Sequence, residues 1–78
     1  MLIRTQDKKS IVNAIHIYVS PQIGSKKRYL FGRYHGASFL NDNSTTLGVY
    51  ESDDAVLQEL DAIALFFAQN PNGIYQMR

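Results

Sequence analysis

The chain has 78 residues, of which 45% are hydrophobic; it has no cysteine and a formal net charge of +1. A chain this short folds as one domain, residues 1–78, with a small core, and the absence of cysteine excludes disulfides and thiolate-bound metals as stabilisers. The longest apolar run, residues 62–68, is far shorter than the ~20 residues that span a membrane, and charges interrupt the first ten residues where a signal peptide is apolar, so we expect a cytoplasmic protein.

The charges divide unevenly along the chain. Residues 1–40 carry seven lysines and arginines and one aspartate, a net charge of +6, whereas residues 41–78 carry six acidic residues and one arginine, a net charge of −5. A chain polarised in this way can steer a charged partner or associate head to tail with a second copy. The plainer interpretation is a basic face and an acidic face that are both solvated.

Alternating apolar residues in the first two thirds of the chain predict β-structure. We expect strands over residues 2–6, 11–19, 26–35 and 45–50, separated by a turn at 7–10, a turn around Pro21 and Gly24, and a loop over 36–44. In the strongest strand a period of two places Ile11, Ile15, Ile17 and Val19 on one face and Val12, Ala14, His16 and Tyr18 on the other.

One amphipathic helix is expected over residues 53–69. Ser52 can cap its first turn, where Asp53 and Asp54 lie against the positive end of the helix dipole. Its spacing places Val56, Leu60, Ile63 and Phe67 in one stripe, with Leu57 and Ala64 at the edge, which is typical of a helix that lies across a sheet.

Two residues of this helix, Leu65 and Phe66, project away from the stripe. A small core without disulfides and these two side chains lead us to expect a homodimer or higher homo-oligomer that covers them. The alternative is that the first strand or Phe39 and Leu40 fold over the same face within one chain.

After the helix, residues 70–73 predict a stop and residues 73–77 a last short strand. The order is β-β-β-β-α-β. We therefore expect an α+β fold in which one helix packs on a face of an antiparallel sheet of four or five strands.

The opening residues 1–7, the junction at Leu47–Ser52, the helix residues Val56, Leu60 and Ile63, and the closing residues 74–77 together carry a resemblance. They are similar to small, mostly uncharacterised proteins encoded by phages and integrated mobile elements of Gram-positive bacteria. The resemblance spans nearly the whole chain and implies a bacterial host cell and an accessory protein that acts by binding. It carries over no catalytic residue.

Catalytic and metal-binding patterns are weak in this sequence. His16 and His35 lie on expected strands without a second ligand at metal-site spacing. The serines lack a nucleophile-elbow context, and helix capping explains the acidic cluster at 51–54. We therefore expect no enzyme, no metal and no cofactor.

The sharpest functional pattern is the basic and aromatic segment over residues 26–35. Cations that alternate with rings are the means by which a sheet neutralises phosphates and stacks bases. The candidate contacts with a partner or with nucleic acid are Lys26, Lys27, Arg28, Tyr29, Arg33 and Tyr34. Tyr29, Phe31 and Tyr34 cannot all share one face of a regular strand, so we expect some rings in the core and only weak general binding of nucleic acid.

The function that these patterns favour is that of a noncatalytic interaction protein of a phage or mobile element. It would associate with itself and bind a host or element protein, and inhibition of a defence or regulatory factor is one such role. The alternatives are nucleic-acid binding through residues 26–35 and binding of a small nucleotide between protomers. No membrane partner is expected.

Overall fold

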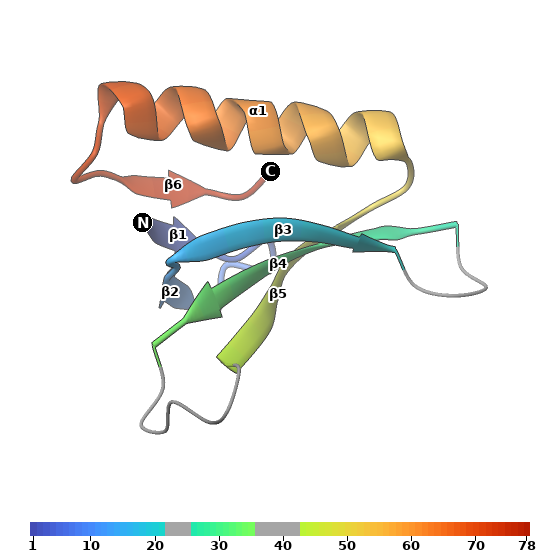
Figure 1. The fold of residues 1–78 in the computed structure, drawn as a ribbon, viewed down its shortest axis with the longest axis horizontal. Coiled ribbons are helices and arrows are strands. Elements are labelled where there is room, and N and C mark those ends of the chain that lie inside the picture. The colour runs from blue at the N-terminus through green and yellow to red at the C-terminus, as the bar shows by residue number, and fades with distance from the viewer. Residues whose placement is uncertain (22–25, 36–42) are drawn as a thin grey trace.

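The computed structural model describes residues 1–21, 26–35 and 43–78. Its elements in chain order are β1 (Leu2–Arg4), β2 (Ile11–Asn13), β3 (His16–Pro21), β4 (Arg28–Tyr34), β5 (Asn43–Tyr50), α1 (Asp53–Gln69) and β6 (Ile74–Gln76) (Figure 1). The turn expected around Gly24 and most of the loop expected over 36–44 lie outside the described residues, whereas Asn43 and Ser44 already belong to β5.

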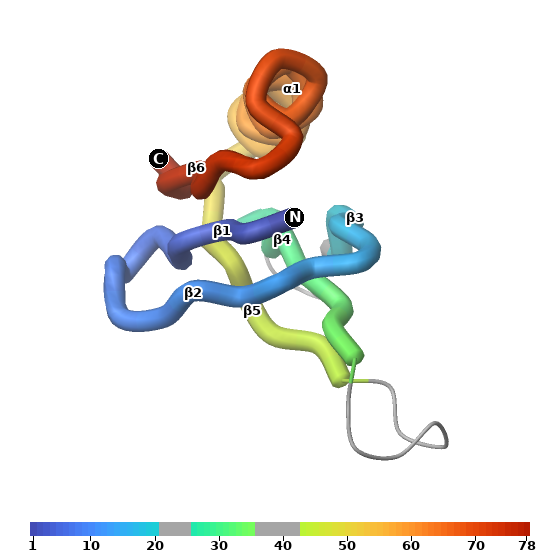
Figure 2. Tube along the Cα trace, turned by 90° about the vertical axis from the view of Figure 1, so that its left-hand side faces the viewer, coloured from blue at the N-terminus to red at the C-terminus, as the bar shows by residue number. Residues whose placement is uncertain are grey.

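The six strands form two sheets of three strands, in the orders β2-β1-β6 and β3-β4-β5. The α+β class is confirmed, but the prediction of a single sheet of four or five strands is wrong. All neighbours are antiparallel except β1 and β6, which pair in parallel with Leu2 opposite Ile74. The first and last strands of the chain therefore lie side by side below α1 (Figure 2).

The expected strand over 11–19 is divided between the two sheets at Ala14 and Ile15. The Ala14 N–H donates to the Met1 carbonyl at 2.8 Å, and the next N–H, that of Ile15, donates to the Arg33 carbonyl at 2.8 Å. This change of partner shifts the alternation by one residue, so Ala14 and Ile17 both point to the core. Ile11 and Ile15 are consequently 57% and 52% exposed, and the predicted apolar face is not continuous.

The β4–β5 pair contains a register shift between Leu30 and Phe31. Leu30 pairs with Gly48 and Phe31 pairs with Thr46, so Leu47 is an extra residue in β5. Leu47 points inward and lies over Gly32, where an added Cβ would be 3.1 Å from its Cδ1. Since a side chain at position 32 would displace Leu47 from the core, the glycine keeps this region closely packed.

The helix has the bounds that the sequence predicts. The Ser52 hydroxyl accepts a hydrogen bond from the Ala55 N–H at 3.1 Å, and Asp53 and Asp54 occupy the first turn. Val56 and Ile63 are buried, and Leu60 and Phe67 pack against the same core, which confirms the predicted stripe. The helix contacts β4, β5 and β6, so it covers the inner faces of both sheets (Figure 1).

The two residues predicted to mediate self-association, Leu65 and Phe66, differ in their exposure to solvent. Phe66 is half-buried, with its ring centroid 5.3 Å from that of Tyr75 and 5.0 Å from that of Phe67. Its ring also occupies the space beside Gly73, where an added Cβ would be 2.8 Å from its Cζ. Leu65 remains 61% exposed. Phe66 therefore packs within the chain, and self-association stays a prediction for Leu65.

We predict that Leu30→Ala lowers the free energy of unfolding by about 3 kcal/mol, because Leu30 is fully buried at the centre of the core. Leu57→Ala removes the same atoms from an exposed helix position and should change stability by less than about 0.5 kcal/mol. Urea unfolding followed by circular dichroism measures both values. Equal losses in the two variants would contradict the core described here.

Candidate functional site

Aromatic side chains form a row on one face of the sheet β3-β4-β5. This face is directed away from α1. Neighbouring ring centroids are 5.2 Å apart for His16 and Tyr18, 5.7 Å for Tyr18 and Phe31, and 6.2 Å for Phe31 and Tyr29. The last two rings are nearly parallel, with an angle of 14° between their planes. We call this set, His16, Tyr18, Phe31 and Tyr29, the ring row.

The strand register explains why these rings share a face. Tyr18 of β3 pairs with Phe31 of β4, and His16 pairs with Arg33. Leu30 precedes Phe31 in β4 and therefore points to the opposite face, where it is buried. Tyr18, Tyr29 and Phe31 are half-buried against one another and do not belong to the core cluster. The rings thus cover the outside of the sheet without filling the interior.

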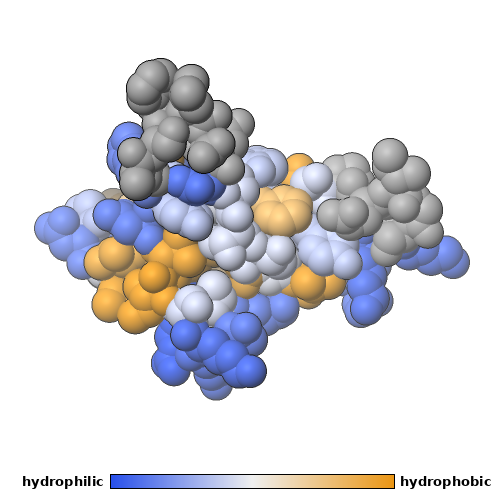
Figure 3. Space-filling model, turned by 90° about the horizontal axis from the view of Figure 1, so that it is seen from below, coloured by the Kyte–Doolittle hydropathy of each residue, from blue (hydrophilic) through white to orange (hydrophobic). Residues whose placement is uncertain are grey.

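Hydroxyl groups and one guanidinium group accompany the ring row. The Tyr18 hydroxyl is hydrogen-bonded to the Ser44 hydroxyl at 3.1 Å. Side chains on this face of the sheet, which we call the outer face, are His16, Tyr18, Ser20, Tyr29, Phe31, Arg33, Ser44, Thr46 and Val49. Figure 3 shows the molecule from below: weakly polar side chains with some hydrophobic ones cover the middle, a hydrophobic patch lies at the left, and hydrophilic side chains lie mainly at the rim.

The six candidate contacts from the segment 26–35 do not form one surface. Tyr29 and Arg33 lie on the outer face, and Lys26 and Lys27 are exposed just before β4. Arg28 points to the other side, where its Nε is 2.6 Å from the Asp53 carboxylate. Tyr34 also lies off the outer face, because it lines a shallow hollow with β2 and Thr45.

Sequence reasoning missed His16, Tyr18 and Phe31 as members of a shared surface. The available signal was clear in only one strand: residues 16, 18 and 20 are polar or aromatic between apolar neighbours, whereas residues 29, 31 and 33 have only Leu30 as a large apolar residue between them. What the sequence does not provide is the register that brings the two sets together.

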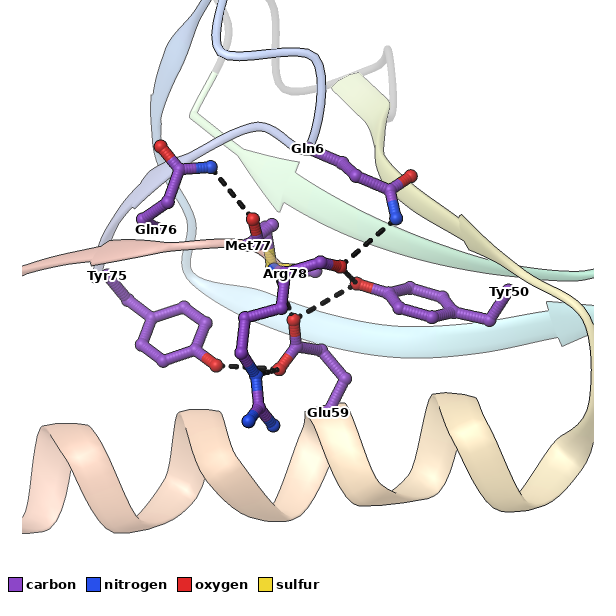
Figure 4. Close-up of polar contacts among 7 residues, drawn as sticks. All are labelled: Gln6, Tyr50, Glu59, Tyr75, Gln76, Met77 and Arg78. Atoms are coloured by element: carbon purple, nitrogen blue, oxygen red, sulfur yellow. Dashed lines mark hydrogen bonds and ion pairs between the residues drawn. The ribbon is translucent and has the colours of Figure 1, made fainter.

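A second polar cluster lies inside the molecule around Glu59, which is only 2% exposed. Its carboxylate accepts hydrogen bonds from the Tyr75 hydroxyl at 2.6 Å and the Tyr50 hydroxyl at 3.1 Å. It also accepts from the Arg78 N–H and from Arg78 Nε, the latter at 3.0 Å (Figure 4). Tyr50 belongs to one sheet and Tyr75 to the other, so Glu59 joins α1 to both.

The protonation of this cluster follows from its contacts. Burial by itself would raise the pKa of Glu59, but the hydrogen bonds from Tyr75, Arg78 and Tyr50 lower it below its usual range. Burial and the bond to this carboxylate raise the pKa of Tyr75 to about 12, and the same causes raise the pKa of Tyr50. Glu59 is therefore an ionised acceptor at neutral pH, and both tyrosines are donors.

Sequence reasoning did not expect the burial of Glu59. Its spacing was the signal, since it lies three residues after Val56 and four before Ile63 and so shares their face.

Other kinds of site are not apparent in the part of the chain that the structure describes. In residues 1–21, 26–35 and 43–78, no group of three histidine or acidic residues is placed to hold a metal ion. Within the same residues, no helix is long and apolar enough to cross a membrane. Comparisons with models of known families, with curated proteins and with solved structures found no match to this chain.

We predict that the protein loses stability in acid through Glu59. Because the folded-state pKa lies below the unfolded value of about 4.3, this contribution is fully present above that pH and is lost as the pH falls through the folded pKa. Urea unfolding at a series of pH values from neutral to acid measures the decline.

The variant Glu59→Gln serves as the comparison for this curve. It leaves the two tyrosines and Arg78 without their ionised acceptor, so we expect a loss of about 3 kcal/mol at neutral pH. Its stability should then change less with pH than that of the wild type. An acid decline of equal steepness in both proteins would assign the effect to other carboxylates.

Proposed function

We propose that this chain is a noncatalytic binding protein and that its ligand is a single-stranded nucleic acid, held on the outer face. The observation that carries the proposal is the ring row, which places His16, Tyr18, Phe31 and Tyr29 on one face outside the core. Aromatic rings on the open face of a sheet stack on bases, and every base has a face to offer.

The open face of the rings supports a single strand over a duplex. Bases in a duplex are already stacked and paired with one another, whereas the unstacked bases of a single strand can lie on aromatic side chains. The hydroxyls of Ser20, Ser44 and Thr46 lie among the rings, where they can donate to or accept from base edges.

The charge of the surface supports weak binding. Arg33 lies on the outer face, and Lys26 and Lys27 lie near its end, but Arg28 faces the helix and pairs with Asp53. Few phosphates can therefore be neutralised, so stacking supplies most of the affinity and added salt reduces it only gently. We expect dissociation constants in the micromolar range.

A protein partner is the second candidate. Tyrosine and arginine side chains of this kind also anchor protein interfaces, and Tyr18, Tyr29 and Arg33 share the outer face. The partner would be a host or element protein, in keeping with the expected phage or mobile-element context. Affinity capture from a Gram-positive lysate with and without nuclease separates the two candidates, since only binding through nucleic acid is abolished by the enzyme.

We predict that Tyr29→Ala weakens binding of a single-stranded oligonucleotide about tenfold, because one stacked base is worth roughly 1–3 kcal/mol. The matched control is Tyr34→Ala, which removes the same side chain from the same strand but off the outer face, and it should change the affinity less than twofold. Fluorescence anisotropy with single- and double-stranded probes measures both, after circular dichroism has shown that the variants are folded.

The same titrations give the results that count against the proposal. Equal effects of the two tyrosine variants, or equal affinity for single strands and duplexes, would exclude stacking on the ring row. Competition by mononucleotides at similar concentrations would indicate a small-nucleotide site instead.

A further inference from the structure

The exposed side of α1 carries both acidic and apolar residues. Asp54, Leu57, Asp61 and Leu65 are all exposed and lie on the side opposite the buried Val56 and Ile63. At 1.5 Å per residue, this stripe extends about 16 Å along the helix. We call it the acidic helix face, and no described element of the chain covers it (Figure 1).

A basic hollow lies on the outside of the other sheet, β2-β1-β6. It has a volume of about 570 Å³ and is lined by Arg4, Lys8, Lys9, Ser10, Ile11 and Ile74. The register explains this composition, because Arg4 of β1 pairs with Ile11 of β2, and the exposed Ile74 lies on the opposite neighbour β6. Cations and apolar side chains therefore line the same concave surface.

The turn from β1 to β2 holds the Arg4 guanidinium and the backbone of Lys8 and Lys9 in place. The Arg4 guanidinium donates from Nε and Nη2 to the Lys8 carbonyl at 3.2 and 3.1 Å, and Lys8 has a left-handed backbone with φ of 66°. Asp7 in the same turn accepts from the Thr5 hydroxyl at 2.6 Å and from the Lys9 N–H at 3.0 Å. The turn is thus held by its own hydrogen bonds, so its backbone is already ordered before a ligand binds.

We propose that the acidic helix face of one copy docks in the basic hollow of a second copy. The two surfaces are complementary in charge, with Asp54 and Asp61 on one and Lys8 and Lys9 on the other. They also match in apolar character, since Leu57 and Leu65 would meet Ile11 and Ile74. This proposal goes beyond the nucleic-acid site, which lies on the other sheet.

The contact is heterologous, because each copy contributes a different surface. The acidic helix face is directed away from both sheets, and α1 lies on the opposite side of β6 and β1 from β2 (Figure 2). The basic hollow lies on the outside of β2-β1-β6. A copy that has docked its helix still offers its own hollow, so association continues into a chain or closes into a ring. Exposed charges are screened by salt, so the assembly should be weak and should dissociate as salt is added.

Two variants test the proposal by disabling one surface each. Asp61→Lys with Leu65→Lys reverses the charge of the helix face at exposed positions, and Lys8→Asn with Lys9→Gln removes both lysine charges from the hollow and leaves only that of Arg4. Sedimentation velocity at low salt measures the mass over a range of concentrations. We expect the wild type to grow beyond a monomer with concentration and each variant to remain monomeric.

The equimolar mixture of the two variants is the decisive sample. The intact hollow of the first variant can accept the intact helix face of the second, and no further contact can form, so the mass should double and then stop. Lys26→Gln with Lys27→Gln removes two positive charges outside the hollow and should associate like the wild type. A wild type that is monomeric at every concentration, or a mixture that stays monomeric while the wild type associates, would overturn the proposal.

Discussion

The structure depends on a buried carboxylate that one helix presents to two sheets. Two small sheets and one 17-residue helix do not enclose a large core, and their inner faces converge where Glu59 meets Tyr50 and Tyr75. A buried carboxylate is stable only when hydrogen-bond donors surround it. Here the two tyrosine donors belong to different sheets. The orientation of each sheet against α1 is therefore fixed by a shared acceptor in addition to apolar packing.

Because the single helix serves both inner faces, no described element of the chain covers the outer face of either sheet or the exposed side of the helix. The sheet β3-β4-β5 has its ring row outside, the sheet β2-β1-β6 has a basic hollow outside, and α1 has an acidic stripe. In a larger α+β domain, further helices would cover at least one of these surfaces. The proposed binding function rests chiefly on the apolar and aromatic side chains that remain on these exposed faces.

Local patterns predicted the elements of this fold better than their arrangement. The helix bounds, the Ser52 cap and the stripe of Val56 and Ile63 follow from spacing alone, and the structure has them as expected. The division of residues 11–19 between two sheets does not follow from spacing. Both halves of this segment alternate, and the division is seen only in the long-range hydrogen bonds, since Ala14 and Ile15 donate to different strands. The same limit applies to the site: composition identified the basic aromatic segment, but the register decides which rings share a face.

The two surfaces proposed for binding lie on different sheets, and this separation has a consequence for affinity. Docking of α1 in the basic hollow, as proposed, would occupy the sheet β2-β1-β6 and not the sheet that carries the ring row, so a head-to-tail assembly would repeat the ring row in every copy. A ligand that is bound to the ring row of one copy would meet the ring row of the next copy at a high effective concentration. The weak stacking free energies of successive copies would then add up. A long single strand has the repeated bases that such an array requires, whereas a mononucleotide does not. Self-association and nucleic-acid binding would thus reinforce each other in this protein. The free energy by which the assembly strengthens binding of the nucleic acid would equal the free energy by which the bound nucleic acid stabilises the assembly.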